Sequence, residues 1–325
     1  MHQAQQRYVG RFAPSPTGPL HLGSLVTAMA SYLEARANRG HWLLRIEDVD
    51  RERCSKTAER EILSQLHAYG FEHDGEIVRQ SDAASEARYE ATLAQLTQLR
   101  LIYGCDCTRA ILATAPRSDA GEIVYPGTCS NKGLLDSSHQ VAIANTNARS
   151  ALRFRTTGSI PELLGSSITF NERGNMMVAD PRNDIGDFII KRSNGQFAYQ
   201  LAVVVDDYDA GVTHIVRGAD LFSNTGRQVA LIRALGFDDL QYFHVPIVLN
   251  DVGEKLSKQT KAVPIAVDNA LATLHNAWVL LKQTPIVNLN SVREFWRQAV
   301  AAWSPDRIAR HSALEKPRDS PNIRK

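Results

Sequence analysis

Arg11-Phe-Ala-Pro-Ser-Pro-Thr-Gly-Pro-Leu-His-Leu-Gly-Ser24 is the stretch that decides the fold of this chain. A β-prone segment at residues 8–12 leads into it, and its prolines and glycine predict a turn. The apolar residues that follow recur at helical spacing until Gly40, which is predicted to end the helix. A second apolar run at residues 42–46 completes a strand-helix-strand unit of the size of a parallel crossover. Phosphate binds beyond the first strand of such a unit, at the helix N-terminus, so the stretch predicts a nucleotide site.

His21 and Gly23 stand at the expected start of that helix, in the sequence His-Leu-Gly-Ser24. A glycine lets a nucleotide approach the backbone closely, and a histidine can donate to a phosphate as its charge develops. A histidine in this position can equally cap the helix or pack in the core. The pair alone therefore does not identify a nucleotide site.

A second candidate nucleotide motif is Lys255-Leu-Ser-Lys-Gln259, which follows an apolar run at residues 245–249 and a turn at residues 250–253. Lysines on a loop can neutralise the charge that builds on a triphosphate during reaction. Taken alone, two lysines three residues apart are typical of a solvated surface.

Together these motifs resemble the class I aminoacyl-tRNA synthetases. Residues 11–18 resemble, residue for residue, the opening of the glutamyl branch, His-Leu-Gly-Ser stands for the HIGH signature, and the lysine motif resembles the KMSKS loop. The fourth signature position is serine here, where the class has histidine. The resemblance implies an ATP site, with Mg²⁺ accompanying the ATP, in which His21 and Lys258 are catalytic. Its residues are His21, Gly23, Ser24, Lys255, Ser257 and Lys258.

The same resemblance implies a glutamate pocket. A substrate with two carboxylates and one ammonium group requires cations and one anion, and positive charge at its side-chain end discriminates against glutamine. The resemblance assigns the cations to Arg11 and Arg217, without deciding which carboxylate each one meets. It assigns the anion to Glu47 and a hydrogen-bonding role to Tyr199. The full implied set is Arg11, Phe12, Ala13, Pro14, Ser15, Glu47, Tyr199 and Arg217.

Three of the four cysteines are clustered, in Tyr103-Gly-Cys-Asp-Cys107 and Tyr125-Pro-Gly-Thr-Cys129. Three thiols can coordinate zinc, whose structural sites have four tetrahedral ligands. Cys-x-Cys is tighter than the usual Cys-x-x-Cys, so spacing alone leaves zinc and three unrelated buried thiols equally open. The resemblance to glutamyl-queuosine tRNA(Asp) synthetases implies one structural zinc per chain, with His139 and Asp106 as competitors for the fourth position. The implied ligands are Cys105, Cys107, Tyr125 and Cys129.

The predicted fold is a Rossmann-type, doubly wound parallel α/β sheet with an inserted zinc-bearing α+β subdomain and a short helical C-terminal region. Residues 1–102 and 193–262 are expected to form the two halves of the catalytic domain. Residues 103–192 form the insertion, which resembles an acceptor-binding subdomain. Residues 263–325 are expected to carry helices around 266–283 and 291–303 and no anticodon-binding domain.

Two segments after residue 192 require a decision about their secondary structure. Ser193-Asn-Gly195 lies between two short predicted strands and indicates a hairpin with a type I′ turn. Residues 199–207 are apolar and β-branched, which is typical of a buried strand. The resemblance instead implies a helix in the wall of the active site, and we follow the resemblance.

Composition adds few restrictions. Hydrophobic and charged fractions of 43% and 22% are ordinary for a globular protein, and a net charge of +2 neither indicates nor excludes a nucleic acid partner. No apolar run approaches the roughly 20 residues of a membrane span, and the N-terminus has no secretory apolar region. We expect a cytoplasmic protein that acts as a monomer without contacting a membrane.

The resemblance implies a two-step reaction. L-Glutamate is activated by ATP to glutamyl-adenylate without tRNA, and is then transferred to the queuosine base in the anticodon loop of tRNA(Asp). The acceptor is implied by the family and by the short region after Gln259, since no residue in the sequence identifies queuosine. The alternatives are a truncated glutamyl-tRNA synthetase that charges a tRNA 3′ end, a small-molecule nucleotidyltransferase, and a non-catalytic zinc-bearing RNA-binding module.

Overall fold

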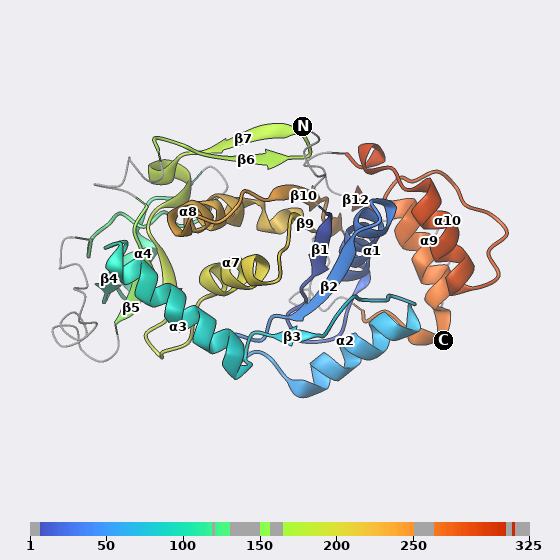
Figure 1. Cartoon of the computed structure of the whole chain (residues 1–325), viewed down its shortest axis with the longest axis horizontal. Helices are drawn as coiled ribbons and strands as arrows, with labels where there is room; N and C mark the ends of the chain where they lie inside the picture. The colour runs from blue at the N-terminus through green and yellow to red at the C-terminus, as the bar shows by residue number, and fades with distance from the viewer. Residues whose placement is uncertain are drawn as a thin grey trace.

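A computed structural model describes residues 7–118, 121–130, 150–156, 165–249 and 263–309, and the backbone of Leu314–Glu315 (Figure 1). Its strands are β1 (Val9–Phe12), β2 (His41–Ile46), β3 (Val78–Arg79), β4 (Ile102–Cys105), β5 (Ala151–Phe154), β6 (Ile168–Glu172), β7 (Asn175–Ala179), β8 (Phe188–Lys191), β9 (His214–Gly218), β10 (Gln241–Val245), β11 (Val248–Leu249) and β12 (Leu314–Glu315). Its α-helices are α1 (Leu22–Ala37), α2 (Lys56–Ala68), α3 (Ala83–Gln98), α4 (Arg109–Ala113), α7 (Tyr199–Asp209), α8 (Thr225–Leu235), α9 (Ala270–Leu280) and α10 (Val292–Ala302). None of the helices in the described residues has the length and apolar character needed to cross a bilayer.

The central sheet consists of two blocks that meet between β1 and β9. Strands β1, β2 and β3 are parallel neighbours, and β9, β10 and β6 form a second parallel block. The backbone N–H of Thr213 donates to the carbonyl of Val9 at 2.9 Å, and Nη1 of Arg11 reaches the carbonyl of Val216 at 3.5 Å. These contacts place β9 beside β1 and running in the same direction. The strand order is therefore β3-β2-β1-β9-β10-β6-β7.

The predicted parallel sheet is mixed in the structure, because β7 runs antiparallel to β6. Arg173 and Gly174 join the two strands and have φ angles of 51° and 80°. Positive φ at both positions is the geometry of a type I′ turn, which returns the chain at once beside the strand it has just left. The edge of the sheet is antiparallel for this local reason.

Helix α1 follows the opening stretch as predicted, but Gly40 does not end it. The helix stops at Ala37, and Arg39 has the left-handed φ of 53° that follows it. Gly40 serves another purpose, since a Cβ atom at this position would lie 2.4 Å from the carbonyl oxygen of Tyr8. The glycine allows β2 to start close beside the chain that enters β1.

Residues 199–209 form helix α7, which confirms the helix implied by the resemblance. Residues 201–207 are all buried, so the helix lacks the polar face whose spacing would have identified it. The β-branched residues in this segment therefore reflect burial rather than a strand. In Figure 1, α7 lies alongside α8 on the side of the sheet where α3 also lies.

The predicted hairpin after β8 is confirmed, but the prediction of a type I′ turn is wrong. Gly195 has a φ of 86°, whereas Asn194 does not have a positive φ. The loop is longer than two residues, with the N–H of Arg192 donating to the carbonyl of Gln196 at 2.7 Å. The second strand shrinks to one bridge between Lys191 and Phe197, because α7 begins at Tyr199.

Strands β4, β5 and β8 form a separate three-stranded antiparallel sheet, which lies with α4 at one end of the molecule (Figure 1). This arrangement agrees with the α+β insertion that was predicted. Strand β6 belongs to the central sheet instead, although its residues lie inside the predicted range 103–192. The exact division into domains remains a prediction.

Helices α9 and α10 confirm the two predicted C-terminal helices and lie at the opposite end of the molecule, against α1 (Figure 1). Their contact with the catalytic part is an aromatic core that includes Trp42, Trp278, Phe295 and Trp296. The indole N–H of Trp296 donates to the carbonyl of Tyr69 at 2.8 Å, so its polar atom is also satisfied. This core holds α1, and with it the candidate nucleotide site, in place.

Candidate active site

His21 caps α1 with its side chain. Its Nδ1 accepts a hydrogen bond from the backbone N–H of Ser24 at 3.3 Å, so in a neutral ring the proton is on Nε2. The helix dipole and the other N–H groups of the first turn, where Gly23 lies, make this helix end attractive to phosphate. The capping role confirms one of the two interpretations of the histidine and is compatible with the other.

Lys255, Ser257 and Lys258 lie outside the described residues. The described chain resumes at Val263, and the next residue, Pro264, forms a β-bridge with His21. Pro264, five residues after the lysine motif in the sequence, therefore lies beside the residue that caps α1.

The residues from Arg11 to Ser15 contribute to the site in different ways. The aromatic ring of Phe12 packs in the core, stacked on Trp42 with 6.2 Å between ring centroids. The carbonyl of Pro14 accepts the backbone N–H of Glu47 at 3.0 Å. This bond ties the end of β1 to the end of β2. The two other residues that follow Arg11 in this stretch differ in burial: Ala13 is half-buried and Ser15 is exposed.

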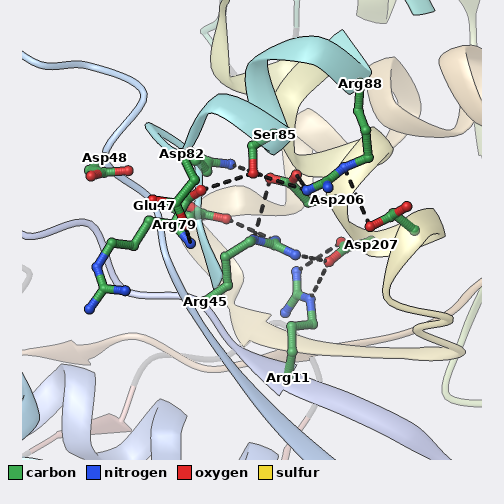
Figure 2. Close-up of polar contacts among 12 residues, drawn as sticks. Arg11, Arg45, Glu47, Asp48, Arg79, Asp82, Ser85, Arg88, Asp206 and Asp207 are labelled. Carbon is green, nitrogen blue, oxygen red and sulfur yellow. Dashed lines mark hydrogen bonds and ion pairs between the residues drawn. The ribbon is translucent and has the colours of Figure 1, made fainter. Parts of the chain in front are cut away.

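A buried ion network joins Arg11 to Glu47 (Figure 2). The carboxylate of Asp207 accepts bonds from Nε and Nη2 of Arg11 at 3.1 and 3.4 Å. Nη1 of Arg45 donates to Oδ1 of Asp207 at 2.6 Å, and its Nη2 donates to Oε1 of Glu47 at 3.1 Å. Two guanidinium groups and two carboxylates thus form one continuous chain of charge-assisted bonds.

Burial and charge oppose each other at these two carboxyl groups. Burial raises the pKa of Glu47, and the nearby Arg45 and Arg11 offset the rise only in part. Burial acts in the same direction on Asp207, but there Arg11 and Arg45 outweigh it, and the pKa of Asp207 is lowered. Asp207 is therefore a stable anion between two guanidinium groups, whereas the charge of Glu47 depends on its neighbours.

Arg217 is held by a second buried network. Its Nη1 and Nη2 donate to Gln228 and Thr225 at 2.6 and 2.8 Å, and its Nε donates to Nε2 of His244 at 3.1 Å. On the other side of the ring, Nδ1 of His244 lies 2.7 Å from Oε2 of Glu172. His244 therefore donates from Nδ1 to the carboxylate and accepts at Nε2 from the arginine.

Tyr199 connects the two networks. Burial raises the pKa of its phenol, the negative charge of Glu47 adds to the rise, and the positive charges of Arg217 and Arg11 oppose it. The three charged residues predicted for the glutamate pocket, Arg11, Glu47 and Arg217, thus all act on this hydroxyl. Two guanidinium groups, a carboxylate and a phenol around one point complement an amino acid that carries two carboxylates.

Sequence reasoning missed Arg45, Asp207, Glu172 and His244. Arg45 had a usable signal, because it lies two residues before Glu47 in an extended segment, where alternate residues share a face. Asp207 ends an apolar run, where an acidic residue requires a buried partner. The pair of Glu172 and His244 had no local signal, since 72 residues separate them.

The three clustered cysteines are brought together in the structure, with their Sγ atoms within 4.8 Å of one another. The hydroxyl of Tyr125 lies 3.4 Å from Sγ of both Cys105 and Cys107. Sγ of Cys107 lies 3.6 Å from Sγ of Cys129. Asp106, one competitor for the fourth position, is exposed and bonded to Ser150. The other competitor, His139, lies outside the described residues.

These distances fit a zinc ion. Zn–S bonds of about 2.3 Å in a tetrahedron place two sulfur atoms about 3.8 Å apart, and a zinc-bound oxygen lies about 3.5 Å from a sulfur. The guanidinium of Arg153 stacks on the ring of Tyr125 at 3.7 Å from its centroid. The described residues thus contain a possible metal site of three thiols and one phenol.

The chain has relatives that are known by name. Residues 8–275 match the family described as tRNA synthetases class I (E and Q), catalytic domain. Glutamyl-Q tRNA(Asp) synthetases of Janthinobacterium sp. (strain Marseille) and Thiobacillus denitrificans (strain ATCC 25259 / T1) are 45% and 46% identical to it, covering 92% and 95% of this chain and 97% of each relative. In fold, it is similar to a glutamate tRNA ligase from Elizabethkingia meningosepticum CCUG26117 in complex with its amino acid, with a TM-score of 0.75 and 22% identity, over 96% of this chain and 67% of that one.

Fold and site together define the catalytic domain of a class I aminoacyl-tRNA synthetase, which is a ligase. Within that class, the chain belongs to the family of glutamyl-Q tRNA(Asp) synthetases, which it matches over nearly its whole length.

Proposed function

We propose that this protein activates L-glutamate with ATP in the absence of tRNA and transfers it to the queuosine base in the anticodon loop of tRNA(Asp). The observation that carries the choice of amino acid is the grouping of Arg11, Arg217 and Glu47 around Tyr199. Two cations and one anion match the charges of glutamate, and a second arginine disfavours glutamine. The acceptor is proposed because the relatives that cover nearly all of this chain are named for it.

In the first step, the α-carboxylate of glutamate attacks the α-phosphorus of ATP, and pyrophosphate leaves. Glu47 binds the ammonium group, and Arg11 and Arg217 bind the two carboxylates. His21 and the N-terminus of α1 stabilise the charge that develops on the phosphate, together with Lys258. Mg²⁺ bound to ATP neutralises further phosphate charge. The remaining proposed ATP contacts are Gly23, Ser24, Lys255 and Ser257.

In the second step, a hydroxyl of the queuosine cyclopentenediol attacks the carbonyl carbon of glutamyl-adenylate. The bond between glutamate and phosphate breaks, AMP leaves, and the hydroxyl loses its proton. We assign no protein base to this step, because an acyl adenylate is already reactive.

We propose one structural zinc ion bound by Cys105, Cys107, Tyr125 and Cys129. Its support is the agreement between their separations and a tetrahedral site. We also propose that the chain acts as a monomer in the cytoplasm, since ATP and its tRNA acceptor occur there, and that its domains divide at residues 102, 192 and 262.

The test is glutamate-dependent exchange of pyrophosphate into ATP without tRNA, followed by transfer of labelled glutamate to tRNA(Asp). Periodate treatment of the tRNA cleaves the vicinal diol of queuosine and should abolish transfer. Exchange that requires tRNA, with label at the 3′ end, would instead identify a glutamyl-tRNA synthetase. Absence of glutamate-dependent exchange would reject the proposal and leave a nucleotidyltransferase or a non-catalytic RNA-binding role.

A further inference from the structure

Arg45 occupies the middle of the ion network that joins Arg11 to Glu47 (Figure 2). Its side chain is 5% exposed, and it comes from β2, two residues before Glu47. One end of the guanidinium donates to Glu47 at 3.1 Å and the other to Asp207 at 2.6 Å. Asp207 in turn accepts from Arg11. Arg45 and Asp207 thus connect the proposed ligand of the ammonium group to a proposed ligand of a carboxylate.

Burying this network of charges in the core carries a large desolvation cost. Removing several charges from water costs several kcal/mol per ion, and apolar residues of similar volume often stabilise a protein equally well or better. Arg45 is a buried charge to which no substrate contact is assigned, so its presence suggests a role other than stability. The connection between Arg11 and Glu47 offers one, because both have to be fixed at a set separation to bind the two ends of one amino acid.

The charge of Glu47 depends on the same contact. In the part of the chain that the structure describes, the groups that face this carboxyl are Arg45 from β2, Arg11 from β1, and Asp207 and Tyr199 from α7. Burial and the charge of Asp207 raise the pKa of Glu47, while Arg45 and, to a smaller extent, Arg11 lower it. Without Arg45, the protonated form of Glu47 becomes more favourable, and a neutral carboxyl group binds an ammonium group weakly.

We propose that Arg45 is a positioning residue for the amino-acid substrate, which holds the carboxylate of Glu47 in place to bind the ammonium group. Arg45 acts through Glu47 and Asp207, whereas the proposed ATP contacts lie on α1 and the lysine motif. The inference rests on the proposed activation of glutamate, because it concerns how that substrate is bound. It predicts a defect that is specific to glutamate.

Arg45→Met tests the proposal, with Arg88→Met as its matched control. Arg88 belongs to the same network and pairs with Asp206 and Asp209 of α7 at 3.6 and 3.4 Å, but it is 29% exposed and makes none of the bonds that hold Glu47. Pyrophosphate exchange is measured without tRNA while glutamate and ATP are varied separately, from about pH 6 to about pH 8.5. In Arg45→Met, the KM for glutamate should rise about tenfold or more at neutral pH, and the KM for ATP should not change.

The pH dependence separates positioning from a general loss of stability. In Arg45→Met, Glu47 is protonated at low pH, so the KM for glutamate should fall as pH rises through the raised pKa of that group. In wild-type protein and in Arg88→Met, Arg45 lowers that pKa, so the same dependence should lie at lower pH. Arg45→Lys keeps the charge, but its single ammonium group cannot bridge two carboxylates as a guanidinium does. It should raise the KM for glutamate severalfold without the shift in pH dependence.

Arg45→Lys carries the test if Arg45→Met does not fold. A wild-type KM for glutamate in the folded variants would overturn the proposal, as would an equal rise in the KM for glutamate and for ATP. Absence of exchange in wild-type protein would reject the proposed activation of glutamate, and with it this inference. If the wild-type protein is active and the KM for glutamate of the Arg45 variants is unchanged, the role of Arg45 is rejected while the proposed activation of glutamate stands.

Discussion

His21 combines two roles in one side chain. Its Nδ1 caps α1 by accepting from the backbone of Ser24, which leaves Nε2–H as the group that can meet a phosphate. The two nitrogens of the ring thus separate the structural contribution from the proposed catalytic one, and substitutions can remove one without the other.

His21→Ala and His21→Asn exploit this separation. Alanine should lower the free energy of unfolding by about 1 kcal/mol through loss of the cap, and lower the exchange rate by about 10²–10³. Asparagine is a good helix cap without an imidazole, so it should restore stability but not exchange. Denaturant unfolding and pyrophosphate exchange measure the two effects. Recovery of exchange in His21→Asn would show that the imidazole contributes only as a cap.

Asp207 is the residue on which the buried cations depend for charge balance. Asp207→Asn keeps a hydrogen-bond acceptor but leaves Arg11 and Arg45 without their shared anion, and should cost about 3–5 kcal/mol of stability at neutral pH. The pKa of Asp207 is lowered in the folded protein, so its stabilising contribution is present above its unfolded pKa and is lost as pH falls through the folded value.

The stability difference between wild type and Asp207→Asn should therefore shrink as the pH is lowered toward and below about 4, as measured by urea unfolding at several pH values. Asp209→Asn is the matched control, because Asp209 lies on the same helix but is 51% exposed and pairs with partly exposed Arg88. Its effect should stay within about 1 kcal/mol. Equal effects of both substitutions would contradict the assigned role of Asp207.

Strand β6 shows how one element serves a site to which it contributes no direct ligand. Its last residue, Glu172, accepts from both the backbone N–H and Nδ1 of His244 at 2.8 and 2.7 Å. The ring of His244 then presents Nε2 to Arg217. The position of a proposed glutamate ligand on β9 thus depends on a strand two places away in the sheet.

Glu172→Gln should loosen this support. Glutamine offers a single acceptor where the carboxylate offered two, so the tautomer of His244 and the orientation of Arg217 are no longer fixed. The KM for glutamate should rise about tenfold in pyrophosphate exchange, with a smaller effect on the KM for ATP. Glu90→Gln, which removes an ion pair of an exposed carboxylate with Lys191, serves as control and should be neutral. An unchanged KM in Glu172→Gln would separate β6 from the site.

At the scale of the whole molecule, the possible metal site is packed apart from the two large cores. Tyr103, Cys105, Tyr125 and Cys129 form their own small cluster, at the end of the molecule opposite α9 and α10 (Figure 1). Because the clusters are separate, loss of the proposed metal should leave the proposed glutamate pocket in place. A large substrate such as tRNA, by contrast, can contact both ends.

Cys105→Ser should remove the metal, which we expect at about one zinc per chain in wild-type protein. Pyrophosphate exchange should remain close to wild type, while transfer to tRNA should fall by an order of magnitude or more. Cys54→Ser, which changes the one thiol outside the cluster, should keep its zinc. Metal analysis and the two activity assays measure these outcomes. Folded, active wild-type protein without metal would refute the zinc site.

The sequence by itself determined the features that depend on neighbours along the chain. The βαβ start and the two C-terminal helices follow from spacing and local propensity, and the His21 cap was one of the interpretations that the residues allowed. The family resemblance added the helix at residues 199–209 and the grouping of the thiols. Tertiary structure alone decided that Asp207 balances Arg11 and Arg45, and that Glu172 orients His244. These contacts join residues 162 and 72 positions apart, on elements whose neighbours in space are set by packing of the whole sheet. Local propensity carries no information about which distant charge will be buried beside another. Such a pair forms only when the strands and helices pack together.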